Sequence, residues 1–145
     1  NCGAYPSIDV HNVAVSNKTY EVETKFNDCT DQGERKEALI KYVELDKYVK
    51  ENNIPNPDFI KLDIEGMETV ALHGMKHIIE TVKPVWQLCY HAAHPEKHEH
   101  YPGFVRTEDG GFDFSTLFED YNISLEGAPV TSFRQWGEYL LVPKK

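Results

Sequence analysis

The sequence predicts an α/β fold with a mostly parallel sheet and an antiparallel terminal strand. Two observations support this prediction. The short apolar runs 59–64 and 85–90 flank a segment whose apolar residues recur at helical spacing, and strand, helix and strand in that order form a parallel unit. The last two apolar runs, 122–126 and 138–142, have no helical segment between them, so we expect the final strand to pair antiparallel to its neighbour.

The first part of the chain has strand character, interrupted by polar turns and followed by one short helix. Runs of β-branched or alternating residues predict the strands, and Asn17-Lys18 makes the turn of an expected hairpin. Asp46 is placed to cap the helix, and Pro55 ends it because proline cannot continue a helix. The expected elements are strands at 8–16, 20–26 and 38–46, of which the first two form the hairpin, and a helix at 46–53.

The second part of the chain alternates strands with helices. Glu65-Gly66 stops the strand at 59–64, and the helical pattern that follows has Gly74 as a joint between two helices. The remaining expected elements are a strand at 85–90, a loop rich in histidine at 91–111, a helix capped by Asp113 or Ser115, and the two closing strands. The aromatic residues expected to pack in the core are Trp86, Phe112, Phe114, Phe118 and Trp136.

Length and composition indicate one domain over residues 1–145 and exclude several partners. The 145 residues are 40% hydrophobic, which is enough for a single buried core. A formal net charge of −9 argues against nucleic acid and against attachment to a membrane surface, because phosphate groups would be repelled. A neutral substrate, such as a small molecule or a carbohydrate, tolerates this charge. Composition does not predict the oligomeric state.

The cysteines predict a protein of a reducing compartment. Cys2, Cys29 and Cys89 are widely spaced and form no Cys-x-x-Cys pair, which argues against a disulfide scaffold or a structural zinc site. Cys89 lies in an apolar run, where we expect it to be a small buried hydrophobe. With no apolar run long enough to cross a bilayer, we expect a soluble protein of the cytoplasm.

Two carboxylates follow the strand at 59–64. Ligands of open α/β sheets bind beyond the carboxyl ends of the strands, so Asp63 and Glu65 are expected at the rim of a binding crevice. Neighbouring carboxylates raise each other's pKa, and one of them is then suited to act as a base or to hold a substrate hydroxyl. A structural alternative is that Glu65 and Glu68 only favour the N-terminus of the next helix through its dipole.

Four histidines crowd the loop after the strand at 85–90. His91 comes directly beyond this strand and is the candidate base, because imidazole titrates near neutral pH. His94, His98 and His100 are expected to be solvated and without a role. The spacing of the four matches no helical pair of metal ligands, so no metal is assigned to them.

Residues 59–75 resemble the signature of the FkbM methyltransferase family. In that family a strand ends in lysine-x-aspartate-x-glutamate-glycine-x-glutamate, and a glycine follows in the next helix. The matching residues are Lys61, Asp63, Glu65, Gly66, Glu68 and Gly74, supported by Asn12-Val-Ala-Val-Ser16 upstream and Lys83-Pro84 downstream. The resemblance covers roughly residues 8–90 well, and the remainder by layout alone.

The resemblance implies a class I methyltransferase-like (Rossmann-like) fold and S-adenosyl-L-methionine as cofactor. The expected reaction is O-methylation of a small-molecule or sugar hydroxyl. Asp63 and Glu65 would line the junction of cofactor and acceptor, Asp63 touching both, and His91 would assist deprotonation. Ala14 and Val15, at the end of an upstream strand, would border the adenine.

One departure from the family pattern concerns the cofactor. The family begins with a strand and a glycine-rich turn that cradle the methionine part of S-adenosylmethionine, and no such segment precedes Ile8. We therefore expect a domain truncated at its N-terminus, inactive alone, with one edge of the strand at 59–64 lacking a partner. Two alternatives remain open: a non-catalytic methyltransferase-like binding module, and a metal-dependent hydrolase built on the histidine loop and Asp63.

Overall fold

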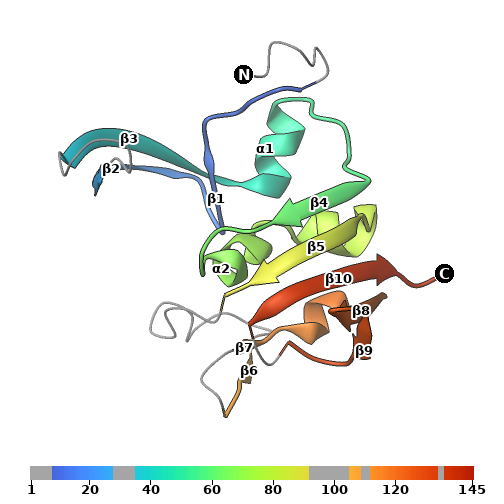
Figure 1. Ribbon diagram of the computed structural model, residues 1–145. Coiled ribbons are helices and arrows are strands. Elements are labelled where there is room, and N and C mark those ends of the chain that lie inside the picture. The colour runs from blue at the N-terminus through green and yellow to red at the C-terminus, as the bar shows by residue number, and fades with distance from the viewer. Residues whose placement is uncertain (1–7, 28–34, 92–104, 109–111, 134–135) are drawn as a thin grey trace.

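The computed structural model describes residues 8–27, 35–91, 105–108, 112–133 and 136–145. Its strands form a three-stranded sheet in the order β1-β3-β2, a five-stranded sheet in the order β4-β5-β10-β8-β9, and a small two-stranded sheet of β6 and β7 (Figure 1). Each of the two larger sheets contains one parallel pair, and its other pairs are antiparallel. The expected α/β class is confirmed, but the expectation of a mostly parallel sheet is wrong for the described residues.

The three-stranded sheet is built around its longest strand. β3 (Arg35–Glu44) pairs antiparallel with all of β2 (Tyr20–Asn27), and its last residues pair in parallel with β1 (Ala14–Ser16). The expected hairpin between 8–16 and 20–26 is therefore wrong. β3 lies between these two strands, and its pairing with β2 over eight positions leaves its other side free for β1. The β2–β3 pair projects from the body of the molecule (Figure 1).

The five-stranded sheet carries the core and the predicted site. β4 (Phe59–Leu62) pairs in parallel with β5 (Val85–Tyr90), which pairs antiparallel with β10 (Gly137–Pro143). The antiparallel terminal strand is thus confirmed. β8 (Tyr121–Leu125) and β9 (Ala128–Val130) complete the sheet, and β9 was not predicted. β4 lies at one edge, and within the described residues it has β5 alone as a neighbouring strand, as expected.

Short helical segments connect these strands. They are α1 (Leu45–Glu51), α2 (Glu68–His73), the π-helix η2 (Ile78–Val82) and the 3₁₀-helix η4 (Ser115–Phe118), while β6 (Val105–Arg106) and β7 (Phe112–Asp113) make the small sheet. Gly74 ends α2, which confirms it as a joint between helices. No helix within the described ranges is long and apolar enough to cross a membrane.

Asp46 caps a different helix from the one expected. The N-cap residue of α1, Glu44, makes no side-chain hydrogen bond to the helix. The Asp46 carboxylate instead accepts hydrogen bonds from the backbone N–H groups of His77 and Ile78, at 2.7 and 3.1 Å, where η2 begins. This contact spans two elements far apart in the sequence, so local capping rules could not reveal it.

Gly74 lies where the end of α2 meets the three-stranded sheet. Its backbone passes so close to β1 that a Cβ atom built there would lie 2.2 Å from the carbonyl oxygen of Ser16. The Gly74 carbonyl also accepts a hydrogen bond of 2.9 Å from the backbone N–H of Asp46. A residue without a side chain is required at this crossing because any Cβ would overlap the backbone of the neighbouring strand.

One hydrophobic core lies against the five-stranded sheet. Trp86, Leu88 and Tyr90 alternate along β5 and are fully buried, and rings of Phe114 and Phe118 pack edge-on against this row. The expectation that the aromatic residues form the core is confirmed for Trp86, Phe112, Phe114 and Phe118. It is wrong for Trp136, which is 66% exposed.

Candidate functional site

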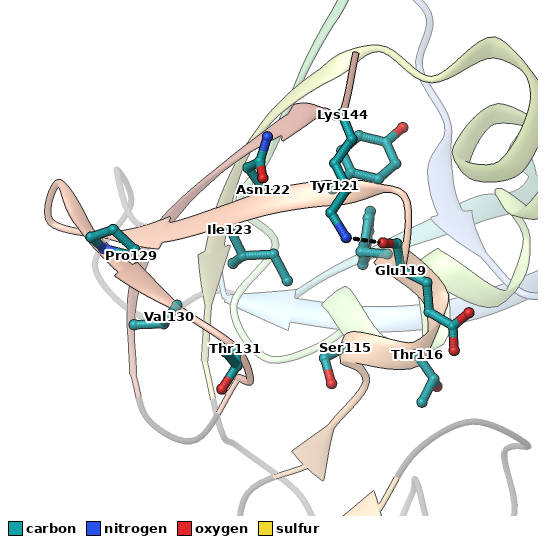
Figure 2. A pocket seen from close by; sticks show the side chains of 11 residues that line it. Ser115, Thr116, Glu119, Tyr121, Asn122, Ile123, Pro129, Val130, Thr131 and Lys144 are labelled. Carbon is teal, nitrogen blue, oxygen red and sulfur yellow. Dashed lines mark hydrogen bonds between the residues drawn. The ribbon is translucent and has the colours of Figure 1, made fainter.

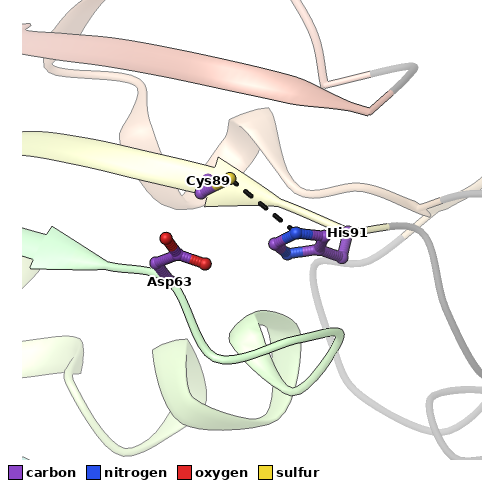
Figure 3. Close-up of side chains that lie close together, drawn as sticks. All are labelled: Asp63, Cys89 and His91. Carbon is purple, nitrogen blue, oxygen red and sulfur yellow. Dashed lines mark hydrogen bonds between the residues drawn. The ribbon is translucent and has the colours of Figure 1, made fainter.

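The parallel pairing of β4 and β5 brings the predicted chemical residues together. The two strands pair in register up to Leu62 and Leu88, so their carboxyl ends meet at one edge of the sheet. Asp63 follows β4 directly and His91 follows β5 directly. Their side chains, with that of Cys89, point toward one another (Figure 3). Asp63 and His91, both candidate site residues from sequence, thus lie close together at this edge of the sheet.

A tight turn after Asp63 is held by a buried carboxylate. Glu65 and Gly66 both have left-handed backbones, with φ of 54° and 89°. The side chain of Glu68 is fully buried and accepts hydrogen bonds from the backbone N–H groups of Ile64, at 3.0 Å, and Gly66, at 3.1 Å. A buried carboxylate is costly unless it is paired, and these donors supply part of the compensation.

His91 supplies the remaining partner of Glu68. Nδ1 of His91 lies 3.1 Å from Oε1 of Glu68. Because an ionised carboxylate can only accept, Nδ1 carries a proton and donates it, and Nε2 is left facing the other groups of the site. Nε2 lies 4.0 Å from Oε2 of Glu65 and 3.8 Å from the thiol of Cys89. The ring of Trp136 meets the imidazole edge-on, with centroids 5.3 Å apart.

The surroundings raise the pKa of His91 above its ordinary value. The hydrogen bond to Glu68 is the main cause, and the charges of Glu68, Glu65 and Asp63 act in the same direction. Burial opposes them, since the imidazole side chain is only 14% exposed. The imidazolium form of His91 is therefore favoured, chiefly through its hydrogen bond to Glu68.

Cys89 also faces this cluster. Along β5 the side chains of Trp86, Leu88 and Tyr90 are buried, so the alternation of the strand directs Cys89 to the opposite face, where it is half-buried. Burial raises the pKa of its thiol, as do the charges of Asp63, Glu138 and Glu68. The expectation that Cys89 is simply a small buried hydrophobe is wrong, because its sulfur lies among polar groups.

The predicted site residues are divided between two places. Asp63, Glu65 and His91 come together at the ends of β4 and β5, whereas Ala14 and Val15 lie in β1 of the three-stranded sheet. Several residues considered in the sequence analysis lie outside the described residues: Cys2, Cys29, His94, His98 and His100.

Two residues of the site were missed from sequence. Glu68 was assigned only a helix-dipole role, yet it holds both the turn and His91. A carboxylate two residues after the glycine of a tight turn is a usable signal, since the turn exposes N–H groups that need an acceptor. For Cys89 the signal is the alternation of β5, with the aromatic and aliphatic residues on one face and cysteine on the other.

A separate hollow lies near the opposite edge of the five-stranded sheet. It has a volume of about 500 Å³ and is lined by residues of η4, β8 and β9 (Figure 2). Lys144 donates a hydrogen bond of 2.5 Å to the backbone carbonyl of Glu119 at its wall. None of Asp63, Glu68 and His91 lines this hollow. We place the candidate site at the ends of β4 and β5 because these three residues come together there.

Comparison with known proteins gives a family and a fold. The family model described as the methyltransferase FkbM domain matches residues 4–115. The crystal structure described as methyltransferase FkbM from Methylobacillus flagellatus KT is similar in fold, with a TM-score of 0.50 and 22% sequence identity. The match covers 92% of this chain and 28% of that one, so the chain spans little more than a quarter of the length of that protein. Curated protein sequences give no match.

Proposed function

Because the chain belongs to the FkbM methyltransferase family, we propose that it carries the acceptor side of the active site of an S-adenosylmethionine-dependent O-methyltransferase. The acceptor would be a hydroxyl of a small molecule or a sugar. The observation that supports this most directly is the convergence of Asp63 with the Glu68–His91 pair at the carboxyl ends of β4 and β5. Ligands of open sheets bind at such ends.

The charge of the site fits a cationic methyl donor. S-adenosylmethionine carries a sulfonium group and an amino group, and when bound it supplies the methyl group that the acceptor oxygen receives. The exposed carboxylates of Asp63 and Glu65 are suited to face these positive charges. Asp63 would hold the amino group or orient the acceptor hydroxyl, and Ala14 and Val15 would border the adenine, as the family resemblance implies.

His91 is suited to take the proton of the acceptor hydroxyl. Its Nδ1 is committed to Glu68, so Nε2 is the atom that would receive a proton. The imidazolium formed in this step is stabilised by Glu68, much as the buried aspartate stabilises the catalytic histidine of a Ser-His-Asp triad. Asp63 and His91 would together hold the hydroxyl in line with the transferable methyl group, and such positioning is worth several kcal/mol without a covalent intermediate.

The test is the substitution Asp63→Asn in the longest natural form of the protein that contains these residues. Methyl transfer from labelled S-adenosylmethionine to a panel of small-molecule and sugar alcohols is measured beside the melting temperature. We expect turnover to fall by about 10²-fold or more, a typical effect of losing a positioning or acid–base group. The melting temperature should barely change, because Asp63 is exposed and lies outside the core.

The matched control is Asp58→Asn. Asp58 is also exposed but precedes β4, at the end of the strand opposite to Asp63. Its substitution should leave turnover unchanged. Near-normal turnover in Asp63→Asn would remove Asp63 from the mechanism, and absence of methyl transfer by the unsubstituted protein to any acceptor would favour a non-catalytic binding module.

A further inference from the structure

Three kinds of metal-binding side chain converge at the candidate site. One ligand atom from each of Asp63, Cys89 and His91 lies within 4.8 Å of the other two (Figure 3). They come from the ends of two neighbouring parallel strands, so the backbone of the sheet fixes their separation. From sequence we assigned no metal, and the metal-dependent alternative combined the histidine loop with Asp63 but did not include Cys89. Cys89 becomes a candidate ligand only once β4 and β5 are paired.

The distance between sulfur and nitrogen is also compatible with a shared cation. The thiol of Cys89 lies 3.8 Å from Nε2 of His91, within the hydrogen-bonding range of sulfur. Two donors bound to one tetrahedral zinc ion, with Zn–S and Zn–N bonds of about 2.3 and 2.0 Å, are separated by roughly 3.5 Å. Asp63 is exposed, and one of its carboxylate oxygens lies within 4.8 Å of both the sulfur and the nitrogen.

A buried carboxylate already orients His91 as a ligand. Glu68 is fully buried and engages Nδ1, which fixes the tautomer that presents Nε2 toward Cys89. Metal-binding histidines in proteins commonly donate their other N–H to a carboxylate, which orients the ring and strengthens the ligand. Glu68 thus makes the interaction that a second-sphere carboxylate makes in such sites, independently of the three ligand atoms.

The cluster carries an excess of negative charge. Asp63 lies near both the thiol and the imidazole, and Glu65 and Glu68 lie beside the imidazole. The ammonium group of Lys61 lies 3.4 Å from the Asp63 carboxylate and offsets one charge. A divalent cation bound between Cys89 and His91 would offset the others.

We propose that Asp63, Cys89 and His91 bind one Zn²⁺ ion and leave its fourth position open. The mixture of thiolate, imidazole and carboxylate suits zinc, whereas Mg²⁺ prefers oxygen ligands alone. On binding, the Cys89 thiol releases its proton to solvent, and His91 keeps its Nδ1 proton toward Glu68. Three protein ligands with an open position are typical of catalytic rather than structural zinc.

The open position gives the ion a role at the site of the proposed function. An acceptor hydroxyl bound there would lose its proton more easily because the cation stabilises the alkoxide. Nε2 of His91 cannot bind zinc and accept a proton at the same time, so ionisation of the hydroxyl by zinc would replace the base role. This consequence rests on the proposed methyl transfer, whereas zinc binding itself does not.

Metal binding is tested without turnover, in a Cys2→Ser/Cys29→Ser variant that retains Cys89 as its one thiol. Co²⁺, which replaces zinc and gives a thiolate charge-transfer absorption band, is titrated optically, and Zn²⁺ is titrated by calorimetry. We expect one ion per chain. Adding Cys89→Ser should abolish the band, and adding His91→Ala or Asp63→Asn should weaken binding by 10-fold or more. Glu68→Gln should weaken it by about 10–100-fold, as loss of a second-sphere partner does.

Two controls separate this site from other ligands. Asp58→Asn and a variant with His94, His98 and His100 all changed to Ala should keep the band and the stoichiometry. Circular dichroism is used to check that each variant is folded. Where a variant is not folded, the parent protein is titrated instead after alkylation of Cys89. Absence of Zn²⁺ binding in the parent, or a Co²⁺ band that survives loss of the Cys89 thiol, would overturn the proposal. Zinc binding with no methyl transfer would uphold it while removing the proposed function.

Discussion

The carboxylate of Glu68 links the turn after β4 to His91 after β5. One of its oxygens, Oε1, lies 3.0 Å from the backbone nitrogen of Ile64 and 3.1 Å from Nδ1 of His91. A single buried side chain therefore sets both the backbone that presents Asp63 and the orientation of the imidazole. Geometry and electrostatics at the site depend on one residue that itself faces no ligand.

Glu68→Gln tests this dependence. The amide retains one acceptor oxygen but places an NH₂ group against N–H donors, so we expect the free energy of unfolding to fall by about 1–3 kcal/mol, a typical cost of breaking charge-assisted hydrogen bonds. The pKa of His91, followed by NMR, should fall because its main raising interaction is removed. The control is Glu80→Gln, at an exposed position of η2. Equal stability of the two variants would restore a simple dipole role for Glu68.

The stability contributed by His91 should depend on pH in a defined direction. Its pKa is raised in the folded protein, so the folded state binds the proton more tightly than the unfolded chain, whose histidines titrate at about 6.5. The contribution is then fully present below about pH 6.5 and is lost as the pH rises through the raised pKa.

The pH dependence is measured by urea denaturation of the protein and of the His91→Gln variant, in the presence of a chelator, from below about pH 6.5 to above the raised pKa of His91. The stability difference between the two should shrink with rising pH. A difference that grows with pH would mean that His91 is held neutral.

Gly74→Ala should be strongly destabilising. The new Cβ would lie 2.2 Å from the Ser16 carbonyl oxygen, and because this atom belongs to the backbone, strand β1 or α2 must move. We expect a loss at the upper end of the roughly 1–3 kcal/mol usual for overpacking, measured by thermal or chemical denaturation. Gly127→Ala is the comparison, because it meets nothing within 4 Å and its φ of 83° carries only the left-handed penalty. An equal loss in both variants would disprove the close crossing.

Asp46→Ala should lower stability without affecting chemistry. Removing the carboxylate leaves the N–H groups of His77 and Ile78 without their acceptor, and loss of a helix cap typically costs about 0.5–2 kcal/mol. Lys47→Ala, at an exposed neighbouring position, is the control. Any methyl transfer or metal binding should be retained in folded Asp46→Ala, and its loss would place α1 in contact with the site.

The positions of the strands were predicted from the sequence better than the pairing between them. The strand at 85–90 was placed correctly and that at 59–64 ends two residues earlier, at Leu62, because local apolar runs and turn residues mark such strands. The pairing of β1 with β3 rather than β2 was not predicted, since register and neighbour are decided by contacts distant in sequence.

The same division holds for the site. Asp63 and His91 were predicted because each follows a strand of a recognisable pair. Glu68 and Cys89 were not, because their roles depend on which groups the folded chain brings within 4 Å of them. A carboxylate near a helix start satisfies a local rule, and that local explanation concealed its buried contacts.

The edge position of β4 gives the two walls of the site unequal freedom to move. β5 is bonded to strands on both sides, whereas β4 within the described residues is bonded to β5 alone. Backbone amides of β5 should consequently exchange with deuterium far more slowly than those of β4, whose local opening costs less free energy. His91 then follows the strand whose amides exchange slowly, and Asp63 follows the strand whose amides exchange fast. When ligands of different size bind, Asp63 should therefore move while the imidazole of His91 keeps its position.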